Sequence, residues 1–285
     1  MTDLSERRAV TTGASIQENL FVATNAHTRA SIARYYDAFS KRLLQDYVYG
    51  NRRIELAINR VLGAADENTK LILDIGCGIG HSSERYAAHC PGWKVTGVDI
   101  SPTNIETATR LFENERLRFL VSDLVENPFS ERFDLISLID VYEHIPRAHW
   151  SRFNSTLGDL LSDSGTLVLT TPTPQHQGYL HQFMPDELQI VDETVQIEDI
   201  VECARAIRAT IVCYEQVVVW KRYDYLHVVM RRDPGYRPLL PSPVATRWRK
   251  RYEGVVGRFD RLHRRARVRS RLGVDITRKA PGPQA

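Results

Sequence analysis

The order of apolar and polar residues along the chain alternates between strand-like and helix-like segments. Short apolar runs predict strands at residues 71–73, 93–99, 117–121, 132–139 and 166–171. Helix-compatible segments lie between them at residues 81–90, 102–112 and 147–161, the last with a closing turn at 162–165. Strands that alternate with helices are typical of a doubly wound, mostly parallel sheet. We therefore predict an α/β fold of this kind.

Both ends of this alternating region have additional segments. Helical apolar spacing is present at residues 28–44 and 52–62, and an insertion rich in Pro, His, Gln and Tyr spans 172–194. After a helix at 197–207, strands at 210–219 and 223–230 are joined by a tight turn at 220–222. The expected organisation is a flexible arm (1–25), a helical cap (26–66), a core domain with its insertion (67–232) and an extension (233–285).

The most informative stretch follows the first strand. Asp74 precedes Gly76, Gly78 and Gly80, so the pattern is acid-x-Gly-x-Gly-x-Gly, and a helix-compatible segment comes next. A glycine turn between a strand and a helix lets backbone N–H groups approach a ligand, because no Cβ intervenes. His81 stands where a dinucleotide-binding G-x-G-x-x-G turn needs its third glycine. The spacing therefore does not match a dinucleotide site.

Four features in series resemble the class I S-adenosylmethionine-dependent methyltransferases. The glycine turn resembles their first motif, and Asp99 ends the second strand 19 residues after Gly80, near the offset of roughly 20 residues at which an acid meets a ribose. Asp123 follows the third strand, and the fourth strand ends in Asp140-Val-Tyr-Glu-His-Ile-Pro. The resemblance implies a Rossmann-like, seven-stranded sheet with an antiparallel final strand, and S-adenosyl-L-methionine as cofactor.

The same resemblance implies a role for each cofactor residue. Gly76 and Gly78 should lie closest to the amino-acid end of the cofactor, and Asp99 should accept hydrogen bonds from both ribose hydroxyls. Asp123 should accept from the adenine amino group, although it could instead be an ordinary acid at a strand end, as could Asp99. Leu124 should meet the adenine edge and Ile100 its face. The full expected set is Asp74, Gly76, Gly78, Gly80, Asp99, Ile100, Asp123, Leu124 and Asp140.

His144 is the best candidate for a general base in methyl transfer to a hydroxyl. An alcohol is a weak nucleophile that needs a positioned base, whereas an amine needs little more than its neutral form. His144 lies just past the fourth strand, at the carboxyl edge of the sheet, and is partly neutral at physiological pH. Glu143 or Asp140 could orient the imidazole or hold a divalent ion such as Mg²⁺, although no spacing demands a metal. The resemblance also allows Glu-His here to line the cofactor pocket without acting as a base.

Aromatic and histidine side chains of the insertion and the N-terminal helices could form the acceptor pocket. Such side chains combine an apolar surface with a hydrogen-bonding end, which suits a sugar ring. We expect the acceptor to be bound by Tyr49, Arg52, His176, Tyr179 and His181. Arg52 could instead clamp the cofactor carboxylate, gate the site or simply begin a helix. Further candidates are Tyr35, Tyr36, Tyr47, Trp220, Tyr223 and Tyr225, of which the last three are better explained as core.

Composition favours a soluble globular protein. The 285 residues are 42% hydrophobic, and no apolar run approaches the roughly 18 residues of a membrane span. Residues 1–25 lack the apolar core of a signal peptide. The four cysteines are Cys77, Cys90, Cys203 and Cys213, with no CxxC pairing or metal-ligand spacing. Free thiols in a cytoplasmic protein are therefore favoured over disulfides.

The net charge of +3 is divided unevenly along the chain. Residues 246–285 contain 13 Lys or Arg and 3 Asp or Glu, so they carry +10 and the preceding residues −7. An apolar helical face runs through the same segment at Trp248, Tyr252, Val255, Val256, Phe259, Leu262 and Ala266. Because an apolar face usually packs on protein, we favour docking or homodimerisation through this helical tail. Peripheral membrane contact is the alternative, and nucleic acid is the partner that we favour least.

A narrower resemblance covers roughly residues 30–232. It rests on the run 140–146, on Thr170-Thr171-Pro172-Thr173-Pro174 and on Pro185-Asp186-Glu187-Leu188. These are similar to bacterial glycan-modifying O-methyltransferases, among them the sugar methyltransferases of mycobacterial methylmannose polysaccharide synthesis. The resemblance implies O-methylation of a saccharide hydroxyl. The alternatives are N- or C-methyl transfer to another small metabolite, or a catalytically silent cofactor-binding regulator.

Overall fold

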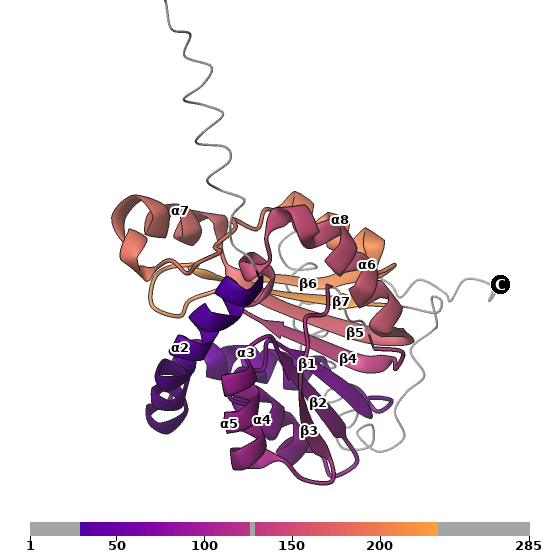
Figure 1. Cartoon of the computed structure of the whole chain (residues 1–285). Coiled ribbons are helices and arrows are strands. Elements are labelled where there is room, and N and C mark those ends of the chain that lie inside the picture. The colour runs from indigo at the N-terminus through magenta and orange to yellow at the C-terminus, as the bar shows by residue number, and fades with distance from the viewer. Residues whose placement is uncertain (1–28, 126–128, 233–285) are drawn as a thin grey trace, which may run out of the picture. The chain divides into compact units, whose positions relative to one another are not determined.

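The computed structural model describes residues 29–125 and 129–232. Within them, seven strands form one sheet in the order β3-β2-β1-β4-β5-β7-β6 (Figure 1). The strands are β1 (Leu71–Ile75), β2 (Lys94–Asp99), β3 (Leu117–Val121), β4 (Phe133–Ile139), β5 (Leu161–Pro172), β6 (Thr210–Val217) and β7 (Tyr225–Arg231). Neighbours among β1 to β5 pair in parallel, whereas β7 runs antiparallel to both β5 and β6. This confirms the predicted doubly wound sheet with an antiparallel final strand.

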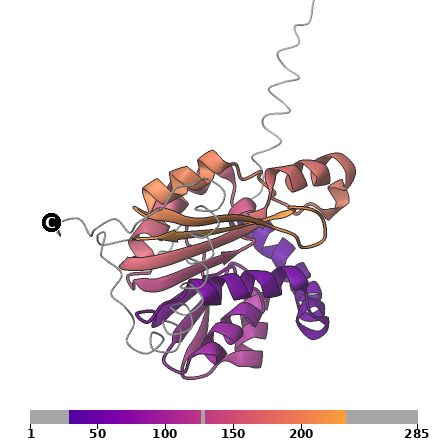
Figure 2. The ribbon, with the colours of Figure 1, turned by 180° about the vertical axis from the view of Figure 1, so that it is seen from behind.

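Helices cover both faces of this sheet (Figures 1 and 2). The helices are α2 (Arg29–Tyr49), α3 (Arg52–Ala64), α4 (His81–His89), α5 (Pro102–Phe112), α6 (Trp150–Leu160), α7 (Pro174–Phe183) and α8 (Ile197–Ala206). Single 3₁₀ turns form η1 (Tyr142–His144), η2 (Arg147–His149) and η3 (Pro185–Glu187). Among the described helices, none is long and apolar enough to cross a membrane. The predicted arm at 1–25 and the apolar face at 248–266 lie outside the described residues.

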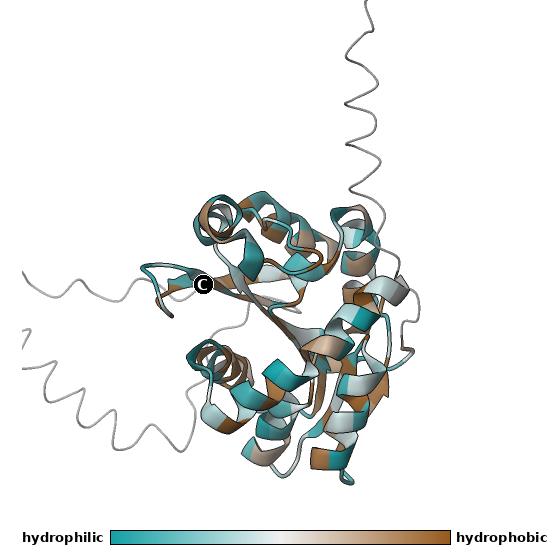
Figure 3. Cartoon of the chain, turned by 60° about the vertical axis from the view of Figure 1, so that its left-hand side comes forward, coloured by the Kyte–Doolittle hydropathy of each residue, from teal (hydrophilic) through white to brown (hydrophobic). Residues whose placement is uncertain are grey.

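The hydrophobic core has two parts because successive side chains of a strand point to opposite faces of a sheet. In β1, Ile72 packs with Ile58 of α3 on one face, in a cluster that also includes residues of α4 and α5. The neighbouring Leu73 packs on the other face, with Leu157 of α6 and Ile200 of α8. Figure 3 shows the apolar and polar positions interleaved along these helices. All five of these core side chains are completely buried.

The connection between β6 and β7 is longer than predicted. The prediction of a tight turn at 220–222 was wrong, because β6 ends at Val217 and β7 begins at Tyr225. The Asp224 carboxylate organises the loop by accepting hydrogen bonds of 2.8 Å from the backbone N–H groups of Val219, Trp220 and Lys221. Because this carboxylate accepts from three backbone N–H groups, the wider loop does not leave these groups without hydrogen-bond partners.

One other local prediction was wrong, and one helix was not predicted. The predicted closing turn at 162–165 is part of β5, where the register against β4 jumps from Phe133↔Leu161 to Leu135↔Thr166, so the extra residues bulge from the ladder. The insertion at 172–194 contains helix α7, which was not predicted. Its start was visible in the sequence, because Thr173 caps the helix and Pro174 occupies the first turn.

Gly97 in the middle of β2 provides a test of how tightly the sheet packs. A Cβ on this residue would lie 2.7 Å from the Phe119 ring and 2.8 Å from the Ser83 hydroxyl. We expect Gly97→Ala to lower the free energy of unfolding by about 1–3 kcal/mol, as overpacking does in dense cores. Gly63→Ala in α3 is the control, since its Cβ would meet nothing within 4 Å. Equal denaturation midpoints for the two variants would contradict the close packing.

Candidate active site

The glycine turn forms the wall of a cavity at the carboxyl end of β1. Gly76, Gly78 and Gly80 have φ angles of 69°, 54° and 87°, in the left-handed region that favours glycine. A Cβ on Gly76 would also collide with the Val141 side chain. The backbone of Gly76 and Gly78 is therefore the cavity surface itself, which fits a ligand that needs close approach to N–H groups. Gly80 caps α4 and does not line the cavity.

Asp74 lies behind the turn rather than in the cavity. Its carboxylate accepts hydrogen bonds from the hydroxyls of Ser82 and Ser83 in α4, at 2.5 and 2.6 Å, and from Ser137 in β4 at 2.5 Å. Burial raises the pKa of Asp74, and these three hydroxyls oppose the effect. Asp74 thus acts on the cavity through the turn, by tying the first residues of α4 to the sheet.

The cavity has a volume of about 290 Å³ and brings together most of the predicted cofactor residues. Those that line it are Gly76, Gly78, Asp99, Ile100, Asp123, Leu124 and Asp140. His144 is also in its wall. The predicted acceptor residues are not in the lining. Tyr49 is exposed at the end of α2, Arg52 donates to the Val219 carbonyl at 3.2 Å, and His176, Tyr179 and His181 lie on α7.

Asp99 is held rigidly at the end of β2. One carboxylate oxygen accepts the Gly78 N–H at 2.9 Å, and the other accepts the Ser101 N–H at 2.8 Å. Burial raises the pKa of Asp99, while these backbone donors and Asn104 oppose it. The oxygen that accepts from Gly78 keeps a second lone pair for a ribose hydroxyl, whereas the other oxygen also accepts the Asn104 amide N–H at 3.4 Å. This geometry suits the role that the resemblance implies for Asp99.

One wall of the cavity comes from α2, and this group of residues was not predicted from the sequence. Ile32, Tyr36, Phe39 and Leu43 all line the cavity. Their spacing of three or four residues places them on one face of the helix. That spacing was present in the sequence, but no residue type in it identifies a cofactor wall, since an apolar face is also what a packed helix requires. Of the four, only Tyr36 was among the candidates.

Arg53, and not Arg52, reaches the cavity. The Arg53 guanidinium forms an ion pair with Asp140, and both side chains line the cavity. Asp140 directly follows β4, has a φ of 53°, and accepts a hydrogen bond of 3.1 Å from the Thr170 hydroxyl. Consecutive residues on a helix point in directions about 100° apart. Arg52 therefore contacts the β6–β7 loop, whereas Arg53, the next residue of α3, reaches the active site.

His144 has a defined tautomer. Its Nδ1 donates a hydrogen bond to the Val191 carbonyl at 2.8 Å, which leaves Nε2 as the acceptor, 2.9 Å from the Gln189 amide nitrogen. Burial lowers the pKa of His144, while Asp192, 3.5 Å from Nδ1, opposes this. The imidazole is therefore neutral at physiological pH, with its free electron pair on Nε2.

Glu143 lies beside His144 but behind the cavity wall. Its carboxyl group is only 1% exposed, and neither oxygen has a hydrogen-bond partner among the described residues. Burial raises the pKa of Glu143 to about 8, with Asp192 adding to the rise and Arg53 opposing it. Glu143 is accordingly protonated and neutral over most of the physiological range.

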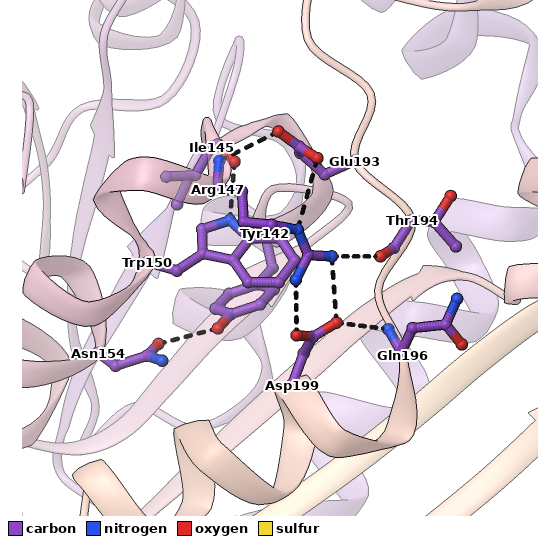
Figure 4. Close-up of polar contacts among 9 residues, drawn as sticks. All are labelled: Tyr142, Ile145, Arg147, Trp150, Asn154, Glu193, Thr194, Gln196 and Asp199. Atoms are coloured by element: carbon purple, nitrogen blue, oxygen red, sulfur yellow. Dashed lines mark hydrogen bonds and ion pairs between the residues drawn. The ribbon is translucent and has the colours of Figure 1, made fainter.

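Arg147 fixes the segment that positions His144 (Figure 4). Its guanidinium lies over the Trp150 ring, 4.1 Å from the centroid, and forms a 2.8 Å ion pair with Asp199. It also donates to the Thr194 carbonyl at 2.8 Å, while the Glu193 N–H donates to the Glu143 carbonyl. Residues 189–194, which include both partners of His144, are thereby tied to η1 and η2. No sequence motif indicated this contact, because its members are about 50 positions apart.

The described residues contain no group of three or more His, Cys, Asp or Glu side chains arranged to hold a metal ion. Asp140 is paired with Arg53, and His144 with Val191 and Gln189. All four cysteines are free thiols, with Cys77 and Cys203 buried.

Comparison with known proteins identifies the family. A family model described as a methyltransferase domain matches residues 47–207. A probable chloroplastic tocopherol O-methyltransferase of Oryza sativa subsp. japonica is 28% identical over 166 residues, 55% of this chain and 45% of that protein. A ubiquinone biosynthesis O-methyltransferase of Coxiella burnetii is 31% identical over 121 residues, 41% of this chain and 50% of that protein. The chain thus spans about half the length of these curated relatives.

Solved structures share the fold at low sequence identity. Magnesium protoporphyrin IX methyltransferase from Synechocystis PCC 6803 aligns with a TM-score of 0.56 and 18% identity, over 72% of this chain and 99% of that one. The chain belongs to the methyltransferase domain family and, as predicted, to the class I S-adenosylmethionine-dependent methyltransferases. The Synechocystis structure is described with S-adenosylhomocysteine bound.

Proposed function

We propose that the protein transfers a methyl group from S-adenosylmethionine to a hydroxyl of a saccharide or glycan precursor, with His144 as the general base. One observation supports this above all: the His144 imidazole lies in the wall of the cofactor cavity, with Nδ1 donating to a backbone carbonyl so that Nε2 can accept a proton. A positioned base of this kind is what an alcohol acceptor needs and an amine does not.

The cofactor supplies an electrophilic methyl group on a sulfonium, which is transferred by in-line displacement. The protein must then align the acceptor oxygen and receive its proton. An acceptor hydroxyl that donates to Nε2 of His144 takes the place of the Gln189 amide, whose N–H can turn to the acceptor oxygen. Asp192, 3.5 Å from Nδ1, stabilises the imidazolium that forms. We also place Asp99, Asp123 and the glycine turn around the cofactor.

The buried polar groups beside the cavity favour a hydroxyl-bearing acceptor. Residues that line the cavity and have a side-chain oxygen without a hydrogen-bond partner among the described residues include Tyr36, Asn104 and Gln189, and Glu143 lies just behind the wall. Burial raises the pKa of both Tyr36 and Glu143, and the Glu143 charge adds to the rise at Tyr36. Unpaired buried polar atoms are costly, so a ligand that pairs them gains affinity.

A phenolic acceptor is the second candidate, because relatives of this chain are named tocopherol and ubiquinone biosynthesis O-methyltransferases. A phenol ionises near pH 10, as tyrosine does, and so depends less on a base than an alcohol does. A phenolic acceptor would therefore reduce the importance of His144.

Incubation with isotope-labelled cofactor and a panel of saccharides, phenols and amines separates these candidates. Mass spectrometry should locate the label on a sugar hydroxyl oxygen. Transfer only to phenols would replace the first proposal with the second. Transfer only to amines would contradict both, and no transfer together with tight cofactor binding would favour a catalytically silent regulator.

A further inference from the structure

Four large aromatic side chains are exposed together at one side of the fold. Tyr179 and Phe183 of α7 are 37% and 61% exposed, and Trp220 and Tyr223 of the β6–β7 loop are 59% and 47% exposed. We call these four residues the aromatic rim. Both views of the ribbon place α7 beside this loop (Figures 1 and 2). The sequence had favoured a core position for Trp220 and Tyr223, which was wrong, whereas Tyr225 is buried as expected.

Ring contacts connect the aromatic rim to the active site. The Arg53 guanidinium, which pairs with Asp140, lies 5.6 Å from the centroid of the Tyr225 ring. The Tyr225 ring in turn contacts His176 and Trp220, with centroids 5.9 and 5.8 Å apart. From His176 the series continues to Tyr179, whose ring is nearly parallel to it, and then to Phe183. The rim is therefore linked to Arg53 through packed rings, although its four residues do not themselves line the cavity.

The charges around the aromatic rim are balanced. Lys221 lies 3.9 Å from the centroid of the Tyr179 ring, and Arg222 lies over Tyr223. Asp186 and Glu187 are exposed in the turn that follows Phe183. The two cations are thus offset by these two anions and by Asp224, which is buried in the same loop and accepts from the Trp220 and Lys221 N–H groups. An anionic bilayer would favour a surplus of positive charge here, so the charges favour a neutral ligand.

Polar groups beside the rings indicate what kind of neutral ligand would fit. Asp186 and Glu187, in the turn that follows Phe183, are exposed and offer carboxylate oxygens as hydrogen-bond acceptors. These two carboxylates can accept hydrogen bonds from hydroxyls, while the rings offer flat apolar faces. A pyranose ring combines these needs, since it has apolar C–H faces and a hydroxyl-bearing edge.

We propose that the aromatic rim is an outer acceptor subsite, which binds a pyranose unit next to the one being methylated. This rests on the proposed saccharide acceptor and makes it more specific: the substrate is an oligosaccharide or a longer glycan rather than a free monosaccharide. Binding at the rim raises affinity for the acceptor without contact with the reacting atoms.

Kinetics with acceptors of different length test the subsite. The probes are methyl glycosides and linear tetrasaccharides of mannose and glucose. Trp220→Ala should raise KM for a tetrasaccharide by about tenfold, as loss of an exposed aromatic contact does at other binding surfaces. It should leave kcat unchanged, as well as KM for the methyl glycoside. Tyr214→Ala on β6 is the matched control, since Tyr214 is 38% exposed outside the rim. Equal KM changes for short and long acceptors would overturn the proposal.

Direct binding keeps the subsite testable if the wild type methylates no saccharide. The fluorescence of the protein is then titrated with the same tetrasaccharides. Saturable binding by Tyr214→Ala that is lost in Trp220→Ala would support the subsite even though the proposed reaction fails. No binding by the wild type would overturn it. Adsorption to phosphatidylglycerol vesicles that requires Trp220, without tetrasaccharide binding, would overturn it as well and identify a lipid surface instead.

Discussion

Replacement of His144 by alanine is expected to lower turnover by about 10²–10⁴-fold, the usual contribution of a general base. The affinity for cofactor should change little, because Nε2 points toward Gln189 and not toward the residues at the end of β2. Turnover is measured with saturating acceptor, and cofactor affinity by calorimetry with S-adenosylhomocysteine. His89→Ala, in an exposed position at the end of α4, is the control for a generic loss of histidine.

The pH dependence identifies which group receives the proton. Only neutral imidazole accepts a proton, and burial lowers the pKa of His144, so the rate should rise with pH below about 6.5 and be level at neutral pH. Glu143 has a pKa of about 8, so a rate limited by its ionisation would still be rising at pH 8. His144→Ala should abolish the acid limb. A rise centred near pH 8 in the wild type would transfer the role of base to Glu143.

Replacement of Asp99 by alanine is expected to weaken cofactor binding by roughly 1.5–3 kcal/mol, the effect of losing a hydrogen bond to a charged group. This corresponds to about 10- to 150-fold in Kd. The ribose hydroxyls would lose a buried acceptor, and the N–H groups of Gly78 and Ser101 would lose theirs. Calorimetry with S-adenosylhomocysteine measures the change. Asp163→Ala, with a side chain that is largely exposed, is the control.

Two further measurements separate cofactor contact from loss of structure. The unfolding midpoint without ligand reports how much of the effect comes from the backbone N–H groups that Asp99 holds. Asp99→Asn keeps one amide oxygen as an acceptor but removes the charge, so its affinity should fall between that of the wild type and that of the alanine variant. An unchanged Kd in Asp99→Ala would contradict contact between this carboxylate and the ribose.

The cofactor half of the site was predictable because its requirements are local. Positive φ angles at Gly76, Gly78 and Gly80 are a backbone property, and glycine is the residue that tolerates them. Asp99 is the last residue of β2 and Asp123 lies two residues after β3, and the carboxyl ends of parallel strands meet at one edge of the sheet. Strand order and residue type together therefore place these groups, without knowledge of any side-chain contact.

The acceptor half was less predictable because it depends on packing between distant segments. His144 contacts Gln189, Val191 and Asp192. These three residues are held in place because Arg147 binds Thr194 and Asp199, which follow them in the chain. Arg53 and Arg52 have the same chemistry and adjacent positions, and only the rotation of α3 against the sheet decides which one meets Asp140.

The sequence by itself determined the class of protein, since the alternation of strands and helices and the glycine turn are short-range patterns. Only the tertiary structure decided that Asp74 supports the turn from behind, that the electron pair of His144 is on Nε2, and that Trp220 and Tyr223 are exposed. The physical reason is the same in each case. Hydrogen-bond partners, tautomers and burial depend on which surfaces meet, and contacts between residues far apart in the chain have no period or spacing that a sequence displays.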